Sequence, residues 1–256
     1  MTQPNFTNPT PSFDASAERM VLPLAGALAD VFAGGDDPAA RVLGALFAPN
    51  IGHGEAVAAF DDTRALLSGN VLGVECVRQL EVLHARTAPE AWTQELGRAA
   101  EATMALLVQK KYQPGSRHAI FAREKIVTFT ACTAWPSATT SPFPLDVVVW
   151  LPSEARGEFI EVKKWFSTYG RDKKFHRKLR RLAEFATALQ ARAGVASWVG
   201  VASIFEDPEV SRNMWTTMLG ALAERTPEVE KLELLTRDSF ARWFSQRDRS
   251  SGSRCR

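Results

Sequence analysis

Cysteine and histidine are scarce in this sequence, and neither is spaced as a metal site requires. The three cysteines, Cys76, Cys132 and Cys255, lie far apart and form no CxxC pair, so the pattern favours neither a disulfide framework nor a thiolate zinc site. We expect buried thiols in a reducing compartment. His53 lies in a turn-like segment, where a loop position is expected. No metal-ligand spacing connects the remaining histidines, His84, His118 and His176.

Long apolar runs are also missing. None approaches the roughly 20 residues that a membrane-spanning helix needs, and the N-terminus MTQPNFTNPTPSFD lacks the basic and apolar regions of a signal peptide. We therefore expect a cytoplasmic protein with no membrane partner, unless it is exported by a route that leaves no such signal. The sequence contains neither a Walker A loop nor a dinucleotide-binding fingerprint, so no nucleotide cofactor is expected.

A strong net charge is absent as well. The formal charge is +2 and the sequence pI is about 8.5, which neither requires nor excludes a nucleic-acid partner. The 256 residues are 45% hydrophobic and 23% charged, so the chain is long and apolar enough to bury a substantial core. Only local clusters of charge can indicate whether the protein binds nucleic acid.

The chain divides into four parts by composition and pattern. Residues 1–14, rich in Asn, Thr and Pro, predict a disordered tail, and residues 247–256 predict a basic disordered tail. Residues 15–88 show helical spacing of apolar residues and predict a helical N-terminal region for recognition, dimerisation or regulation. Residues 89–246 predict an α/β core.

The core pattern begins with the end of the helical stretch, which runs to about Lys111. Short segments rich in β-branched and aromatic residues follow and predict three strands, over 125–135, 144–151 and 158–165. The pattern then predicts a helix over 171–192, a strand over 196–205 and a helix that contains 214–225. A short strand over 231–236 and a last helix from about Asp238, with Thr236 as N-cap, are predicted to follow. We expect a mixed β-sheet flanked by helices.

Two carboxylates and a lysine are predicted to meet at one end of a hairpin. Side chains two apart in a strand share a face, so Glu161 and Lys163 project together while Ile160 and Val162 face the other side. If PSEARG is the hairpin loop, counting back from its middle places Asp146 across from Lys163, with Glu161 one step along.

This set of side chains suits phosphodiester hydrolysis. Two carboxylates can hold Mg²⁺, with Mn²⁺ as a substitute, and the metal lowers the pKa of a bound water and offsets developing charge. A lysine can orient the attacking water and stabilise the phosphate in the transition state. No covalent nucleophile is needed, which agrees with the lack of a Ser-His-Asp or Cys-His arrangement in the sequence.

The segments PLDVVVW and FIEVKKW, followed by a long helix and an apolar strand, resemble the PD-(D/E)xK nuclease superfamily over about residues 89–206. The resemblance implies a restriction-endonuclease-like core over 89–246, metal binding by Asp146 and Glu161, and a catalytic Lys163. The sequence departs from the family pattern in one place, since Leu145 separates Pro144 from the acidic residue. GRAAEATMALLVQKKY resembles the family helix that carries a further catalytic glutamate, which points to Glu101, or to Glu95 instead.

A basic helix directly follows the Glu161–Lys163 strand. Its apolar stripe is predicted to pack on the sheet, and the rest of its first half is cationic. The predicted nucleic-acid-binding residues are Arg171, Lys173, Lys174, Arg177, Lys178, Arg180 and Arg181. Such clusters can neutralise phosphates, although alone they also occur on solvated helix faces. Its position beside the predicted metal site favours phosphate contact.

Aromatic residues near the site are mostly expected to pack in the core. Trp135, Trp150 and Trp165 are interpreted in this way, and Trp165 and Tyr169 are also candidates for substrate contact.

These patterns together predict a Mg²⁺-dependent endonuclease, a hydrolase that acts on DNA in restriction or phage defence. Cutting both strands would favour a homodimer. Two alternatives remain open: a structure-specific, repair or RNA nuclease, and a nucleic-acid-binding protein without turnover on a nuclease-like fold.

Overall fold

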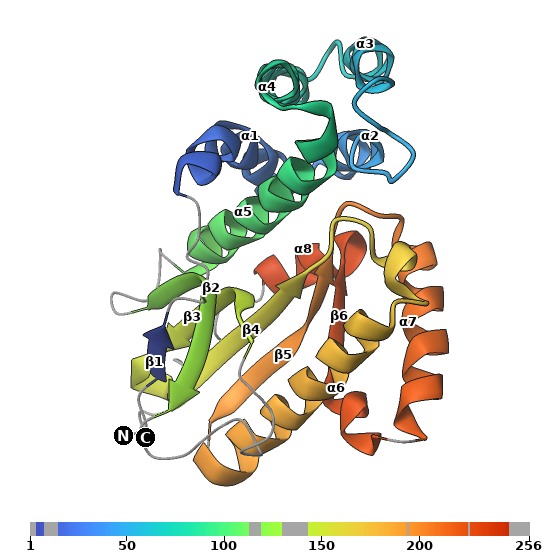
Figure 1. Cartoon of the computed structure of the whole chain (residues 1–256). Coiled ribbons are helices and arrows are strands. Elements are labelled where there is room, and N and C mark those ends of the chain that lie inside the picture. Colours follow the sequence, from blue (N-terminus) through green and yellow to red (C-terminus); the bar gives the residue numbers. More distant parts are fainter. Residues whose placement is uncertain are drawn as a thin grey trace.

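The computed structural model describes residues 4–7, 15–112, 119–129, 143–193, 195–224 and 226–245. Within them, six strands form one sheet in the order β1-β2-β3-β4-β5-β6 (Figure 1). Neighbours from β1 to β4 are antiparallel, whereas β4, β5 and β6 run parallel. The strands are β1 Pro4–Thr7, β2 Ile120–Phe129, β3 Leu145–Leu151, β4 Arg156–Val162, β5 Ala196–Ser203 and β6 Glu233–Thr236. The predicted mixed α/β architecture is confirmed.

Five helices precede the main part of the sheet and gather on one side of it in Figure 1. They are α1 Ala15–Ala33, α2 Asp37–Ala45, α3 Ala56–Leu66, α4 Val71–Arg86 and, after the 3₁₀ turn η1 Pro89–Ala91, α5 Trp92–Tyr112. Side-chain caps set two of the starts: Asp36 accepts from the Ala39 N–H and Asn70 from the Gly73 N–H.

Helices of the second half alternate with strands. They are α6 Lys173–Ala188, α7 Pro208–Ala223 and α8 Arg237–Ser245, with the π turn η4 Leu189–Ala193 and the 3₁₀ turns η2 Pro152–Glu154, η3 Phe166–Tyr169 and η5 Pro227–Lys231. Asp172 caps α6 and Asp207 caps α7, each accepting from two backbone N–H groups. In Figure 1, α6 runs alongside β5 in front of the sheet.

The sheet separates two hydrophobic cores. One contains the buried side chains of α1–α5 and α8 together with Val147, Val149, Ile160 and Val162. The other contains those of α6 and α7 together with Val148 and other sheet residues, such as Trp150 and Phe159. The sheet is therefore buried on both faces, which accounts for the apolar run Val147–Leu151 in β3.

The N-terminal helices pack closely on the segment that follows β5. Phe205 stacks on Phe47, two residues after α2, with ring centroids 4.2 Å apart, and it meets Phe32 of α1 edge-on. A Cβ atom added at Gly44 would lie 2.2 Å from the Phe205 carbonyl oxygen, so only glycine permits this approach. The helical region thus shares a core with the sheet.

Two sequence expectations are corrected by the strands. Residues 4–7, expected in a disordered tail, form β1 and pair with β2 from Pro4–Phe129 to Thr7–Ile126, because Phe6 packs against the core beneath α6. The strand expected over 125–135 instead begins at Ile120. The rest of the 1–14 tail, residues 130–135 and the tail 247–256 lie outside the described residues.

No helix among the described residues is both long and apolar enough to cross a membrane.

Candidate active site

Strand β4 presents its side chains alternately to the two cores, as its sequence predicts. Ile160 and Val162 are buried on the α5 side, whereas Phe159 belongs to the core beneath α6. Glu161 shares the Phe159 face and is fully buried. Lys163, one residue past the strand, donates a hydrogen bond to Glu161 Oε1 and another to the Val162 carbonyl oxygen at 3.0 Å. The predicted carboxylate and amine pair is confirmed.

Asp146 lies on the neighbouring strand and faces the same site. The β3–β4 register pairs Val147 with Ile160, which puts Asp146 beside Glu161 rather than Lys163. The predicted register is therefore wrong by two residues. The cause is the turn: Leu151 already pairs with Arg156, so the loop spans four residues and not six. Asp146 Oδ2 accepts a hydrogen bond from the Val162 N–H at 2.7 Å, which ties its side chain to β4.

A second lysine reaches these carboxylates from α6. Lys178 Nζ forms an ion pair with Glu161 Oε2 and lies 3.9 Å from Asp146 Oδ1. The sequence assigned this residue to nucleic-acid binding, together with its basic neighbours. The structure instead brings it into the site, where two acidic and two basic side chains meet.

Burial and charge set the ionisation of the group. Burial, and next the charge of Glu161, raise the pKa of Asp146 to about 6. Burial also acts to raise the pKa of Glu161, but the ammonium groups of Lys163 and Lys178 outweigh it and hold that pKa below its ordinary value. Burial acts to lower the pKa of Lys163, and the charges of Glu161 and Asp146 overcome it and raise this pKa. Lys163 is therefore a permanent cation at neutral pH.

Asp146 and Glu161 are suited to a hard divalent cation. Both are carboxylates on adjacent strands, and each turns one oxygen toward the same Lys178 Nζ. Within the described residues, no group of three or more His, Cys, Asp or Glu side chains is arranged to hold a metal ion. A metal here would take these two protein ligands, and water and substrate oxygens would complete its shell.

The basic residues of α6 and of the turn before it divide into two groups. Arg171, Lys173, Lys174 and Arg177 are exposed, whereas Lys178, Arg180 and Arg181 are half-buried. Arg181 lies over the ring of Phe143, a residue just before β3, and its guanidinium carbon is 4.6 Å from the ring centroid. The first turn of α6 lies beside the carboxylate site, since Lys163 Nζ is 5.5 Å from the centroid of the Phe175 ring. Contact of the exposed group with nucleic acid stays a prediction.

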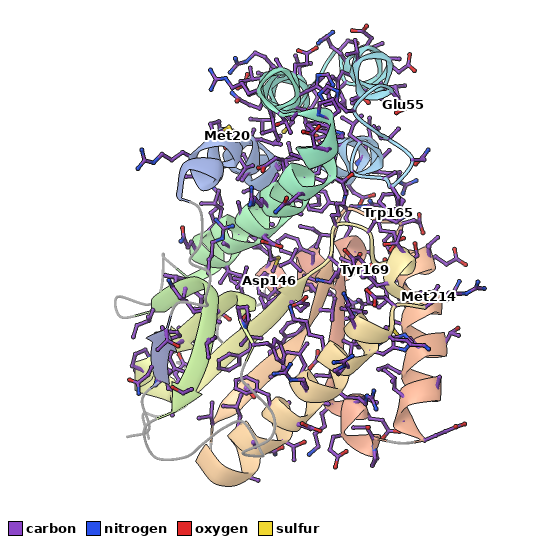
Figure 2. The ribbon with its side chains drawn as sticks, viewed as in Figure 1. Met20, Glu55, Asp146, Trp165, Tyr169 and Met214 are labelled. Atoms are coloured by element: carbon purple, nitrogen blue, oxygen red, sulfur yellow. The ribbon has the colours of Figure 1, made fainter. Side chains whose placement is uncertain are left out.

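The segment after β4 carries the candidate aromatic contacts. Trp165 and Tyr169 are half-buried and lie, with Asp146, toward the end of the sheet where β4 terminates (Figure 2). Lys163 Nζ lies 5.3 Å from the Tyr169 ring. Trp150 is a core residue, as predicted, and Trp135 lies outside the described residues. Substrate contact by Trp165 or Tyr169 stays a prediction.

Sequence reasoning missed a buried carboxylate that holds this segment. Glu206, fully buried after β5, accepts hydrogen bonds from the Ser167 N–H, the Ser167 hydroxyl and the Ser211 hydroxyl. Ser203 continues the network through Ser211. The sequence shows an acidic residue directly after an apolar strand, which could have marked Glu206 as a candidate. Its hydrogen-bond partners belong to two other elements, η3 and α7, so the network itself was not predictable from the sequence.

The candidate glutamates Glu101 and Glu95 belong to α5, which packs on the opposite face of the sheet from α6. Glu101 is half-buried on α5, and its catalytic role stays a prediction. Glu95, the alternative, is buried and paired with Arg98 of the same helix. Glu158 of β4 is also buried on this side, where it accepts from the Tyr112 hydroxyl and pairs with Lys111. It links α5 to the sheet.

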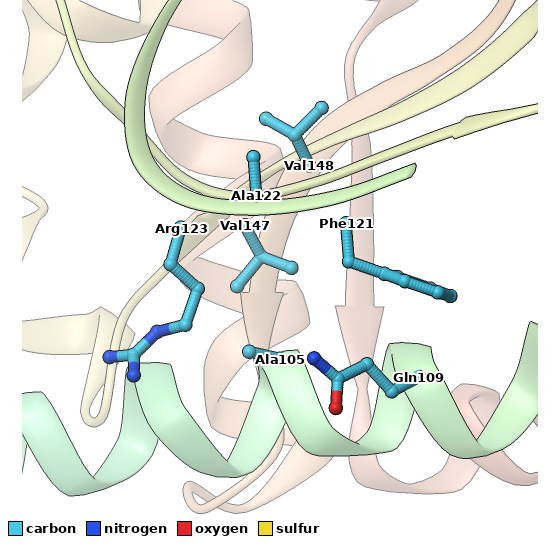
Figure 3. A pocket seen from close by; sticks show the side chains of 7 residues that line it. All are labelled: Ala105, Gln109, Phe121, Ala122, Arg123, Val147 and Val148. Atoms are coloured by element: carbon cyan, nitrogen blue, oxygen red, sulfur yellow. The ribbon is translucent and has the colours of Figure 1, made fainter. Parts of the chain in front are cut away.

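A small cavity of about 70 Å³ lies between α5 and strands β2 and β3. Arg123, Val147 and Phe121 point from the strands toward Ala105 and Gln109 of α5, as Figure 3 shows. Val148 and Ala122 point away from the helix. Since Lys178 approaches Asp146 and Glu161 from α6, the cavity and the carboxylates lie on different sides of the sheet.

The histidines have structural partners where they are described. His53 and His84 stack with ring centroids 3.8 Å apart, and each ring lies within hydrogen-bond distance of a backbone carbonyl. His176 bonds the Gly170 carbonyl. Cys76 is buried, and burial raises its pKa to about 12, so it is an inert thiol. His118, Cys132 and Cys255 lie outside the described residues.

Comparisons with protein-family models, with curated proteins and with solved structures found no match to this chain. The geometry of the site therefore carries the functional argument.

Proposed function

We propose that this protein is a metal-dependent endonuclease that hydrolyses phosphodiester bonds in DNA, in restriction or phage defence. The observation that carries the proposal is the meeting of Asp146, Glu161 and Lys163 at the end of the β3–β4 hairpin. Two buried carboxylates beside a permanent ammonium suit a site for a divalent cation and a phosphate.

The order of elements supports a restriction-endonuclease-like core. Helix α5 is followed by three antiparallel strands, then by α6, and then by β5, which pairs parallel to β4. This is the order that the sequence resemblance implies. It puts the carboxylates on the two central strands and the basic helix directly after them.

Each side chain has a distinct part in this proposal. Asp146 and Glu161 would hold Mg²⁺, or Mn²⁺ in its place, which when bound supplies an acidified water and a Lewis acid for the phosphoryl oxygen. The raised pKa of Lys163 makes it a hydrogen-bond donor and a counter-charge rather than a base. It holds the nucleophilic water and neutralises charge on the scissile phosphate.

The exposed cations at the start of α6 support a nucleic-acid substrate. Arg171, Lys173, Lys174 and Arg177 are exposed and come shortly before Lys178, the α6 residue that reaches the carboxylates, so they can follow a phosphate backbone. Contacts of this kind give affinity without sequence readout. A homodimer would align two such sites for cleavage of both strands.

The proposal is tested by incubating the purified protein with plasmid, linear duplex, branched duplex, single-stranded DNA and RNA, each with Mg²⁺, Mn²⁺ or EDTA. We expect cleavage of duplex DNA with either metal and none with EDTA. Cleavage of branched DNA alone would favour a structure-specific repair nuclease, and cleavage of RNA alone an RNA nuclease. Binding without cleavage of any substrate would favour a protein that only binds nucleic acid.

A further inference from the structure

The ammonium of Lys178 lies where the two carboxylates of the site direct their remaining oxygens. Asp146 Oδ2 is engaged by the Val162 N–H, and Glu161 Oε1 is engaged by Lys163. The other oxygens, Asp146 Oδ1 and Glu161 Oε2, approach the same Lys178 Nζ. A cation that binds both carboxylates through these two oxygens therefore meets the Lys178 ammonium.

Charge balance opposes a divalent cation in the presence of both ammonium groups. With Asp146 ionised, the four side chains carry two negative and two positive charges. Glu161 is fully buried, and the Asp146 and Lys163 side chains are nearly so. Adding a divalent cation without moving a lysine would leave two unbalanced positive charges in a poorly solvated site, which is strongly unfavourable.

Of the two lysines, Lys178 is the one that can leave. Lys163 also donates to the Val162 carbonyl, and its Nζ lies 5.3 Å and 5.5 Å from the ring centroids of Tyr169 and Phe175. Lys178 Nζ lies 5.3 Å from the Phe143 ring centroid. Lys178 is more exposed, with 27% of its side chain accessible against 14% for Lys163. Its stem begins on α6, next to the exposed Lys174 and Arg177. A lysine on a solvent-facing helix can turn its ammonium to water or to a phosphate at low cost.

We propose that Lys178 is an internal competitor for the metal, so that a divalent cation binds Asp146 and Glu161 only when the Lys178 ammonium is displaced. This inference rests on the proposed function, because it takes these carboxylates as the metal ligands. Without metal, the two lysines balance the charge of the two carboxylates. With metal bound, the Lys178 ammonium turns away from them toward the exposed cations of α6, Lys174 and Arg177.

The first test measures Mn²⁺ binding directly, from the electron paramagnetic resonance signal of the unbound ion. The proteins are wild type, Lys178→Met, which keeps the length and removes the charge, and Lys174→Met, which removes an exposed charge one turn earlier. We expect Lys178→Met to bind Mn²⁺ about tenfold more tightly than wild type, and Lys174→Met to match wild type. Equal affinity in wild type and Lys178→Met would overturn the inference and leave the nuclease proposal standing.

Thermal melting separates this role from a purely structural ion pair. Without metal, Lys178→Met leaves Glu161 and Asp146 poorly balanced and melts below wild type. Mn²⁺ should raise the melting temperature of Lys178→Met more than that of wild type, because the ion replaces the missing charge. A structural role alone would lower both melting temperatures of the variant without this larger response to metal.

A second measurement needs no variant and covers the case in which Lys178→Met does not fold. Wild-type protein is acylated briefly with an N-hydroxysuccinimide ester, with and without Mg²⁺, and labelling is read by peptide mass spectrometry. Labelling of Lys178 should increase severalfold with Mg²⁺, while that of Lys174 stays constant. If Mn²⁺ binds wild type but Lys178 labelling does not change, the inference fails alone. If no protein binds Mn²⁺, it fails together with the metal-dependent function.

Discussion

The carboxylate of Asp146 accepts a hydrogen bond from the backbone N–H of Val162, 2.7 Å away on the next strand. This side-chain bond joins β3 to β4 just beyond the paired residues Val147 and Ile160. It brings Asp146 beside Glu161 and next to Lys163, and it keeps one Asp146 oxygen directed toward α6. The candidate site therefore depends on the hairpin backbone as much as on the side chains.

The first prediction concerns the pH dependence of stability without metal. The folded pKa of Asp146 is raised to about 6 from an ordinary value of 3.8. Its contribution to stability is therefore fully present below about pH 4 and is lost as the pH rises through about 6. In EDTA, the free energy of unfolding of wild type relative to Asp146→Asn should fall between pH 4 and pH 7, by at most about 3 kcal/mol. Urea titrations check this, and a difference that is constant with pH would contradict it.

The second prediction concerns the exposed cations of α6. If Lys173 and Arg177 contact phosphates, replacing both by Gln should weaken binding to duplexes of any sequence. The slope of log affinity against log salt should fall by about two. Fluorescence anisotropy with two unrelated duplexes at several salt concentrations measures both effects. The charge-matched control replaces Arg19 and Arg86, two exposed residues of α1 and α4, by Gln. An equal change in slope for both pairs would mean that α6 has no special part in binding.

The third prediction concerns the buried carboxylate of Glu206. Glu206→Ala removes the acceptor for Ser167 and Ser211 and should lower the free energy of unfolding by about 2–4 kcal/mol. Ser211→Ala removes one of these bonds and should cost about 1 kcal/mol. Hydrogen exchange in η3, residues 166–169, should accelerate in Glu206→Ala. Unchanged exchange there, with normal stability, would show that the network does not hold this segment.

The fourth prediction concerns the contact between α2 and the segment after β5. Gly44→Ala places a methyl group 2.2 Å from the Phe205 carbonyl oxygen, so the helix must move and stability should fall by about 1–3 kcal/mol. Gly97→Ala is the matched control, because its added methyl meets nothing within 4 Å on α5. That variant should gain about 0.5–1 kcal/mol from helix propensity. Similar behaviour of the two variants in urea unfolding would argue against the close packing of α2.

Local patterns in the sequence were enough to predict most elements and part of the site. Alternation along β4 correctly placed Glu161 and Lys163 on one face, because a strand has a fixed period of two. The hairpin register was wrong because the turn includes η2 and then Ala155 in the left-handed region, with φ of 47°. Loop length by itself does not reveal where such a turn ends.

Contacts between distant segments could not be predicted in the same way. Strand β1 forms because Pro4 pairs with Phe129, far along the chain. Lys178 reaches Glu161 because of the way α6 crosses the sheet, and a basic helix pattern is the same whether a given lysine faces solvent or a carboxylate. The partners of Glu206 come from η3 and α7, which the sequence does not bring together.

Cleavage of duplex DNA by wild type, Asp146→Asn and Lys163→Met, with the neighbouring Lys164→Met as control, tests whether these residues form a nuclease site. Rates are measured in Mg²⁺, and folding is checked by circular dichroism. We expect Asp146→Asn and Lys163→Met each to lose at least about a hundredfold in rate, and Lys164→Met to stay within severalfold of wild type. Wild-type cleavage rates in folded Asp146→Asn and Lys163→Met would contradict the account.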